Sequence, residues 1–189
     1  MGSNYHANNS PAFISTIRED LLRLSLLTAG KKSYISGPGF WMGLFSPRFI
    51  PVFIYRLSSA LYDRNFSFLS KSLSLFNFIF FGLEIYVGCK IGPGLVLPHT
   101  QGTVIGAYSI GNNATIFNGV TLGAVMFETL ISEKTRPIVG NDVTIGAGAK
   151  VLGGVSIGDR VKVGANAVVI TSIPSGFTAV GVPSRNYEI

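Results

Sequence analysis

The C-terminal half of the chain carries an aliphatic residue at every sixth position. From residue 85 onward, thirteen positions follow this spacing: Ile85, Ile91, Leu97, Val104, Ile110, Ile116, Leu122, Val139, Ile145, Val151, Ile157, Val163 and Val169. Glycine directly follows seven of them. An amphipathic helix needs spacings of three and four, and a half-buried strand needs alternation of two, so neither template fits.

A period of six predicts one short strand and one tight corner per repeat, with the aliphatic side chain inward and glycine at the turn. Three repeats close a triangular coil, so thirteen repeats predict about four coils of a mainly β, parallel β-helix. Each coil buries its apolar stripe only against its neighbours, which explains the regularity. We expect this β-helix over residues 85–173 and a cap or tail over 174–189, where the period is lost.

Residues 1–84 follow a different pattern, which predicts an aromatic-rich helical region. The first helix is expected to begin at Ile17, after a capping Ser15 or Thr16, and to end at Gly30. Glu19 and Asp20 then fall in its first turn, where the helix dipole favours negative charge.

Two aromatic stretches, 40–61 and 66–83, complete this region. Neither reaches the roughly 20 uncharged apolar residues that a membrane-spanning helix needs, because polar residues interrupt them: Arg48, Arg56, Lys71 and Asn77. We expect these stretches to pack on a partner subunit or, alternatively, to lie at a membrane surface.

Composition narrows the class of protein. Charged residues make up only 13% and hydrophobic residues 47% of the 189 residues, which argues against intrinsic disorder. A single cysteine, Cys89, excludes a disulfide scaffold and indicates a reducing compartment; its repeat position places it in the core. The net charge of +6 is scattered, so nucleic-acid binding is not expected. The polar N-terminus has no export signal pattern, so we expect a cytoplasmic protein.

The period slips at two places, where a solenoid is expected to extrude functional loops. One extra residue lies near His99, which is the only histidine outside the N-terminal tail. Val139 lies seventeen positions after Leu122 instead of six, which predicts an extruded loop over residues 123–138. This loop includes Phe127, Glu128, Lys134 and Arg136.

Several segments resemble the hexapeptide-repeat acyltransferases, which have a left-handed parallel β-helix. They are Lys90-Ile-Gly-Pro-Gly-Leu, Leu97-Pro-His-Thr-Gln-Gly-Thr-Val-Ile-Gly, Gly119-Val-Thr-Leu-Gly, Ile145-Gly-Ala-Gly-Ala-Lys-Val-Leu-Gly and Val180-Gly-Val-Pro-Ser-Arg. Within that family the chain resembles the serine acetyltransferase branch, and most of all the O-acetyltransferases of polysaccharide biosynthesis. The resemblance implies an acetyl-CoA-dependent O-acetyltransferase. It also implies a homotrimer with active sites between neighbouring β-helices, or a hexamer paired through the N-terminal region.

The resemblance implies that His99 is the general base and that Glu84 orients it, where the family usually has aspartate. The chemistry is reasonable without the family, because an imidazole with a pKa near 6.5 can accept the proton of an attacking alcohol. Transfer is expected to be direct, without a covalent enzyme intermediate.

Other residues match family positions for the donor and the acceptor. Ala124, Ala147 and Lys162 match sites along the CoA groove, and Arg185 is a candidate partner for a CoA phosphate. Asn118 and Arg136 are candidate acceptor-binding residues.

The acceptor is predicted from one departure. Serine acetyltransferases carry Arg-His-Pro after the extruded loop, whereas this chain has Thr135-Arg136-Pro137 and lacks the second histidine. We therefore expect the acceptor to be a sugar hydroxyl in capsule, O-antigen or exopolysaccharide synthesis, with the enzyme in the cytoplasm or at the inner face of the membrane. The alternative is serine, in cysteine biosynthesis.

Two other classes of protein could have the same type of β-helix. A zinc carbonic anhydrase on the same type of helix needs three histidine ligands, and the chain has two histidines, so no metal is expected. A non-enzymatic β-helix would not bind acetyl-CoA and would not need His99 or the extruded loop.

Overall fold

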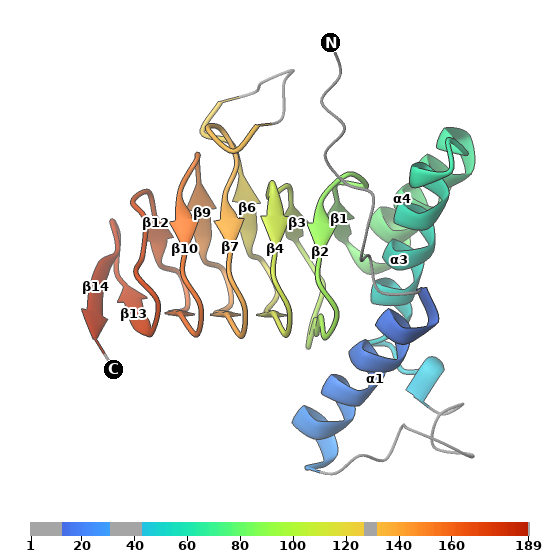
Figure 1. Ribbon diagram of the computed structural model, residues 1–189, viewed down its shortest axis with the longest axis horizontal. Helices are drawn as coiled ribbons and strands as arrows, with labels where there is room; N and C mark the ends of the chain where they lie inside the picture. The colour runs from blue at the N-terminus through green and yellow to red at the C-terminus, as the bar shows by residue number, and fades with distance from the viewer. Residues whose placement is uncertain (1–12, 31–42, 127–131, 189) are drawn as a thin grey trace.

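The computed structural model describes residues 13–30, 43–126 and 132–188. Figure 1 shows a row of stacked β-coils with helices at one end. The helices are α1 (Phe13–Ala29), α3 (Ile50–Asp63) and α4 (Ser67–Phe81). None of the described helices is long and apolar enough to cross a membrane.

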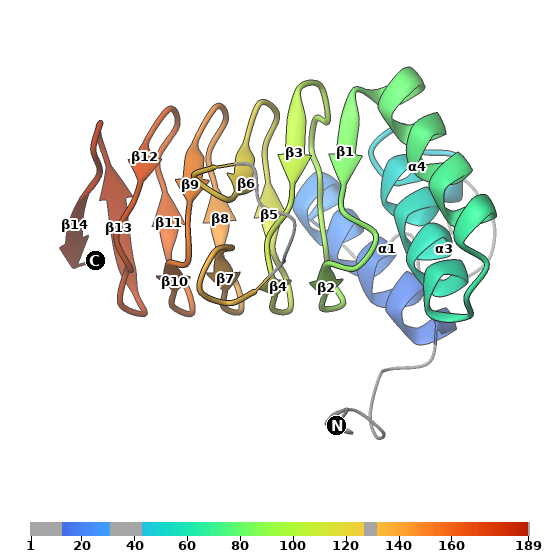
Figure 2. The same cartoon turned by 90° about the horizontal axis from the view of Figure 1, so that it is seen from above.

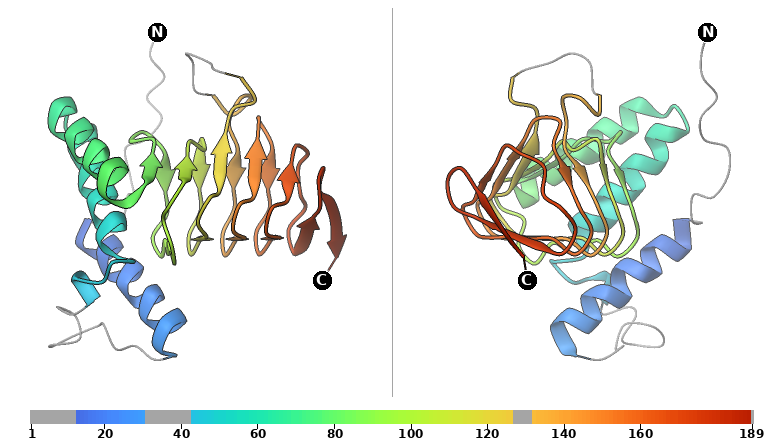
Figure 3. Two further views of the ribbon diagram at one scale, coloured as in Figure 1. Left: turned by 180° about the vertical axis from the view of Figure 1, so that it is seen from behind. Right: turned by 60° about the vertical axis from the view of Figure 1, so that its left-hand side comes forward.

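The coils form three sheets, and successive strands visit them in turn, which makes each coil triangular (Figure 3). The first sheet contains β1 (Leu83–Ile85), β3 (Thr103–Ile105), β6 (Thr121–Gly123), β9 (Lys150–Leu152) and β12 (Val168–Val169). The second contains β2 (Lys90–Ile91), β4 (Ser109–Ile110), β7 (Ile138–Val139) and β10 (Ser156–Ile157). The third contains β5 (Thr115–Ile116), β8 (Thr144–Ile145), β11 (Lys162–Val163), β13 (Phe177–Val180) and β14 (Arg185–Glu188).

All pairs of named strands are parallel except the last, because β14 turns back and pairs antiparallel with β13. The tail beyond residue 173 therefore closes the third sheet at the end opposite the helices (Figure 2). The predicted parallel β-helix is thus observed in the described residues.

The inward positions of the repeat form the main core. Ile116, Leu122, Ile145 and Val151 are completely buried. The assignment of Val104 to this set is wrong, since Val104 is 36% exposed and Ile105 is 0% exposed.

The register of β3 explains that error. Ile105 pairs with the buried Ile85, and Val104 pairs with the exposed Glu84. The turn between Leu97 and β3 is therefore two residues longer than the period allows, and the step from Ile105 to Ile110 is one residue shorter. Because the two offsets sum to one residue, the spacing along the sequence shows only a single extra residue.

Helix α1 begins earlier than expected, at Phe13 rather than Ile17, so it has no acidic residue in its first turn. Its predicted end is confirmed: the helix stops at Ala29, and Gly30 follows with a φ of 64°. Asp20, expected near the helix start, is instead completely buried.

Asp20 joins the helices to the first coil. Arg56 of α3 donates from Nε to Asp20 Oδ2 at 2.9 Å and from Nη2 to Oδ1 at 3.1 Å. The backbone N–H groups of Gly94 and Leu95 donate to the same Oδ1 at 2.7 and 2.9 Å. Burial raises the pKa of Asp20, while Arg56 and the two backbone donors act in the opposite direction.

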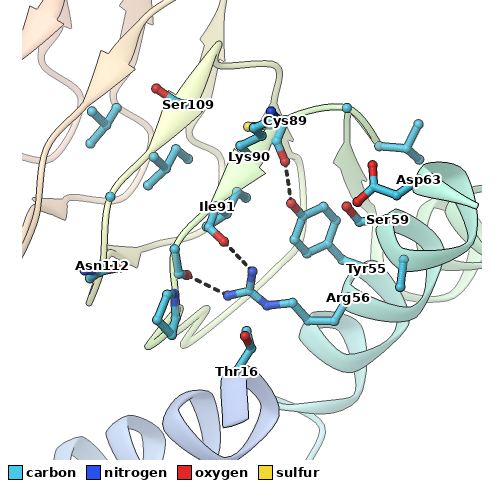
Figure 4. Close-up of a pocket in the computed structure, with 18 of the residues that line it drawn as sticks. Thr16, Tyr55, Arg56, Ser59, Asp63, Cys89, Lys90, Ile91, Ser109 and Asn112 are labelled. Atoms are coloured by element: carbon cyan, nitrogen blue, oxygen red, sulfur yellow. Dashed lines mark hydrogen bonds between the residues drawn. The ribbon is translucent and has the colours of Figure 1, made fainter. Parts of the chain in front are cut away.

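Helix α3 also contacts the coil directly (Figure 4). Arg56 donates to the carbonyls of Ile91 and Gly92 at 2.5 and 2.7 Å, and the Tyr55 hydroxyl donates to the Cys89 carbonyl at 2.6 Å. Cys89 is a buried free cysteine, as expected, and burial raises the pKa of its thiol to about 12. A thiol with that pKa is not a nucleophile at neutral pH.

Candidate active site

His99 lies exposed in the turn that leads from the third sheet to the first. The next residue, Thr100, donates from its hydroxyl to the Phe81 carbonyl at 2.8 Å, and Gly102 N–H donates to the Gly82 carbonyl at 3.0 Å. These bonds hold the turn against the start of β1, where Glu84 also lies exposed. Within the described residues no hydrogen bond joins Glu84 to His99, so its orienting role stays a prediction.

Turns of the following coils stack on the His99 turn. Gly119 N–H donates to the Gln101 carbonyl at 3.0 Å, and Gly148 N–H donates to the Asn118 carbonyl at 2.8 Å. His99, Asn118 and Ala147 therefore lie along one edge of the β-helix, between the third and first sheets. We call this the histidine edge.

Ala124 and Arg136 lie on a different edge, between the first and second sheets, which we call the loop edge. Arg136 is half-buried, and its Nη1 donates to the Gly106 carbonyl at 2.9 Å. Its Nε is buried without a hydrogen-bond partner among the described residues. Phe127 and Glu128 of the predicted loop lie outside the described residues. Because the first sheet separates the two edges, one chain does not bring Arg136 beside His99.

The two candidate phosphate partners share the third sheet. Lys162 is exposed on β11, which pairs with β13. Arg185 is exposed on β14, which also pairs with β13. The last strands of this sheet thus present two cations that fit an anionic group such as a phosphate.

A hollow of about 420 Å³ adjoins the His99 turn. Helix α1, the segment before α3, the third sheet and the turn before His99 line it with Leu24, Leu27, Thr28, Arg48, Val96, Pro98, Thr115 and Phe117. Pro98 directly precedes His99, and Arg48 is the charged residue of the lining. Nothing in the sequence pattern singled out Arg48, which looked only like an interruption of an aromatic stretch.

Among the described residues, no group of three or more His, Cys, Asp and Glu side chains is placed to hold a metal ion. The histidine edge carries the imidazole of His99 and the amide of Asn118, and the loop edge carries the guanidinium of Arg136. The carboxylate of Glu84 lies on β1.

Comparisons with known proteins supply the family. The pattern described as "Bacterial transferase hexapeptide (six repeats)" matches residues 136–171. A serine acetyltransferase of Helicobacter pylori is 46% identical over 143 residues, which are 75% of this chain and 82% of that protein. The chain belongs to the serine acetyltransferase family.

Solved structures of serine acetyltransferases share the fold. The enzyme of Neisseria gonorrhoeae in complex with serine matches with a TM-score of 0.78 and 29% identity, over 92% of this chain and 68% of that one. A serine acetyltransferase in complex with CoA matches with a TM-score of 0.79 and 30% identity, over 94% of this chain and 71% of that one. The expected fold class, a left-handed parallel β-helix with N-terminal helices, is confirmed.

Membership in the serine acetyltransferase family confirms the predicted activity class, an acetyl-CoA-dependent acetyltransferase. The predicted saccharide acceptor is wrong, because the matching proteins are named serine acetyltransferases and one was solved with serine. The departure at Thr135-Arg136-Pro137 is local, whereas the likeness to the Helicobacter pylori enzyme covers 75% of the chain.

Proposed function

We propose that the protein is a serine O-acetyltransferase, which transfers the acetyl group of acetyl-CoA to the hydroxyl of L-serine. The observation that carries this proposal is the 46% identity to a serine acetyltransferase over three quarters of the chain. The unpaired, buried Cys89 agrees with a reducing, cytoplasmic setting for this reaction.

His99 acts as the general base. Its imidazole accepts the proton of the serine hydroxyl while that oxygen attacks the thioester carbonyl. The new C–O bond forms, the C–S bond breaks, and the imidazolium returns the proton to the departing thiolate. Glu84 would stabilise the imidazolium, and the amide of Asn118 would donate to the acceptor or to the developing oxyanion.

Arg136 offers a reason for serine as the acceptor despite the missing second histidine. A guanidinium binds a carboxylate with two parallel hydrogen bonds, and serine carries a carboxylate that a neutral sugar lacks. Because Arg136 and His99 lie on opposite edges of the first sheet, we infer a trimer in which His99 works with Arg136 of the partner subunit.

The donor would lie along the coils. Ala124 and Ala147 leave room beside the main chain on the two edges, and Lys162 and Arg185 fit the phosphates of CoA. When bound, acetyl-CoA supplies the activated acetyl group. The chain's own residues orient it and accept the proton.

The test is release of CoA thiol from acetyl-CoA with L-serine, compared with L-alanine, which lacks the hydroxyl. Serine should drive release and gain one acetyl group by mass spectrometry. His99→Ala should lower kcat by about a hundred- to ten-thousand-fold. Arg136→Gln should mainly raise KM for serine, because it removes a binding contact.

Gln101→Ala is the matched control, since Gln101 is exposed in the same turn as His99. It should leave kcat within about threefold of the wild type. Equal thiol release with serine and alanine would refute the proposed acceptor. Full activity in His99→Ala would refute the assignment of the base.

A further inference from the structure

Two tyrosines at the loop edge have no part in the reaction described so far. Tyr86 directly follows β1, at the corner between the first and second sheets, and Tyr62 lies in the last turn of α3. Burial and the adjacent Tyr62 hydroxyl raise the pKa of Tyr86, while the positive charge of Arg136 lowers it. Because the pKa is raised overall, the Tyr86 phenol is protonated at neutral pH and has an O–H group to donate.

Tyr86 lies one coil away from the Arg136 guanidinium, because the first two coils stack at this corner. Ile85 of β1 pairs with Ile105 of β3, and the Tyr86 N–H donates to the Ile105 carbonyl at 2.9 Å. The next carbonyl, that of Gly106, accepts from Arg136 Nη1 at 2.9 Å. A side chain at Gly106 would overlap that nitrogen, so the glycine lets the guanidinium lie against the second coil.

A second glycine fixes the position of the Tyr86 ring. A Cβ atom at Gly88 would lie 2.7 Å from Cε1 of that ring and 2.8 Å from its hydroxyl oxygen. The ring therefore lies directly over Gly88, inside the turn that the Cys89 N–H closes by donating to the Tyr86 carbonyl at 2.9 Å. The place of the hydroxyl depends on the absence of a side chain at residue 88.

The inferred trimer brings a second histidine edge to this corner. Rotation about an axis that runs along the β-helix leaves every residue at its own height in the stack of coils. Height changes by one coil from β1 to β3 (Figure 2). The His99 turn falls between these strands in the chain, after the corner of Tyr86 and before that of Gly106. His99 of the partner subunit therefore faces the loop edge between Tyr86 and the carbonyl that holds Arg136.

The groups at this height suit a carboxylate. Arg136 Nη1 is occupied by the Gly106 carbonyl, and among the described residues Nη2 makes no hydrogen bond. A guanidinium N–H and a phenol O–H can each donate to one oxygen of a carboxylate.

We propose that the Tyr86 hydroxyl binds the carboxylate of the acceptor serine beside Arg136, in a site completed by His99 of the partner subunit. Tyr62 positions that hydroxyl. This inference rests on the proposed function, since it takes serine as the acceptor. It makes Tyr86 a residue that selects acceptors with a carboxylate over neutral alcohols.

The test is Tyr86→Phe, which removes only the hydroxyl, in the thiol-release assay. The variant should raise KM for L-serine about tenfold, because a hydrogen bond to a charged group is lost. It should leave kcat and KM for acetyl-CoA within about threefold of the wild type. L-serine amide, which lacks the negative charge, is measured as acceptor or as competitor of serine. Its constant should change by less than about twofold.

Gly88→Ala is a second variant, which keeps the hydroxyl but displaces it. The φ of Gly88 is not positive, so alanine fits the backbone, and the overlap falls on the movable end of the Tyr86 side chain. KM for serine should rise, and adding Gly88→Ala to Tyr86→Phe should produce no further rise. Tyr187→Phe is the matched control, since Tyr187 is an exposed phenol on β14, at the opposite end of the molecule. Thermal unfolding would verify that each variant is folded.

The outcomes separate this contact from the proposed function. If release depends on serine but Tyr86→Phe keeps the wild-type KM, the contact is refuted and the function stands. An equal rise for serine and its amide would also refute the contact, as would a fall in kcat alone, which would assign the hydroxyl to the oxyanion. A wild type without serine-dependent release would refute the function, and the contact with it.

Discussion

The β-helix and the helical layer, which consists of α1, α3 and α4, bury different kinds of side chain. In the coils, aliphatic side chains point inward and are completely buried at positions such as Leu122 and Ile145. In the helical layer, Ser70 and Asn77 are buried between α3 and α4, and a buried ion pair of Asp20 and Arg56 joins the helices to the first coil. Helix α4 meanwhile exposes leucine, isoleucine and phenylalanine.

The contrast shows that the two regions are stabilised by different kinds of interaction. Each coil buries apolar surface against its neighbours and needs nothing else. The helical layer has a small apolar cluster, in which Ile17, Leu21, Leu24 and Phe49 pack with Val96, and it adds specific polar contacts, which are directional and costly to leave unmade. The two regions should therefore respond differently to the same kind of substitution.

The largest expected effect is at the joint between the regions. Arg56→Met leaves the buried Asp20 carboxylate without its partner, which should cost about 3–5 kcal/mol of unfolding free energy in urea titrations. The deficit should shrink as the pH falls from 7 toward 3.8, the ordinary pKa of aspartate. An unpaired buried carboxylate has a raised pKa, so its destabilising ionised form is present at high pH and lost on protonation.

Arg64→Met is the control for this prediction, since Arg64 is an exposed arginine at the end of the same helix. The unfolding free energy of Arg64→Met should stay within about 0.5 kcal/mol of the wild-type value. Reaction of the Cys89 thiol with a disulfide reagent should quicken in Arg56→Met, because Cys89 lies beneath α3. Equal stability of the two arginine variants would contradict the structural role of the ion pair.

A leucine in each region gives a sharper comparison. Leu122→Ala removes a fully buried side chain and should cost about 2–5 kcal/mol. Leu75→Ala removes one that is 56% exposed and should cost less than about 0.5 kcal/mol in aqueous buffer. Urea unfolding of both variants measures the difference. Similar losses would mean that the face of α4 is covered in solution.

The smallest expected effect is at a corner of the coils. Asp159 Oδ1 accepts hydrogen bonds from the backbone N–H and from Nδ2 of Asn141, at 2.6 and 3.1 Å. Asp159→Ala should cost about 1 kcal/mol. Asp63→Ala, an exposed aspartate of the helical layer, should change the unfolding free energy by less than that. An equal loss at both sites would show that the corner bond adds nothing.

The sequence was sufficient for the coils because their interactions are periodic. A residue such as Ile145 contacts neighbours one coil away, and the same spacing repeats along the chain. The prediction for Val104 is wrong because one turn is two residues longer and the next step one residue shorter, and the sequence shows only their sum, a single extra residue. The local spacing cannot distinguish Val104 from Ile105, whereas the pairing with Ile85 does.

The helical layer was less predictable, because its contacts are not periodic. Asp20 contacts Arg56, which is 36 residues away in sequence, and Gly94, which is 74 residues away. No local sequence pattern predicts either contact. The saccharide prediction is wrong for a related reason: the departure at Thr135-Arg136-Pro137 covers three residues, whereas the likeness to a serine acetyltransferase extends over 143 residues. The role of His99 stays a prediction, which rests on its place beside a slip in the repeat.

The reversal of the chain at β14 limits how these molecules can assemble. A stack of parallel coils ends in strand edges, which can template another chain and extend into a fibre. Here the helices occupy one end, and the other is finished by an antiparallel strand of four residues that carries Arg185 and Glu188. This short, charged strand covers the edge of the third sheet, so extension of a parallel ladder through that sheet is disfavoured.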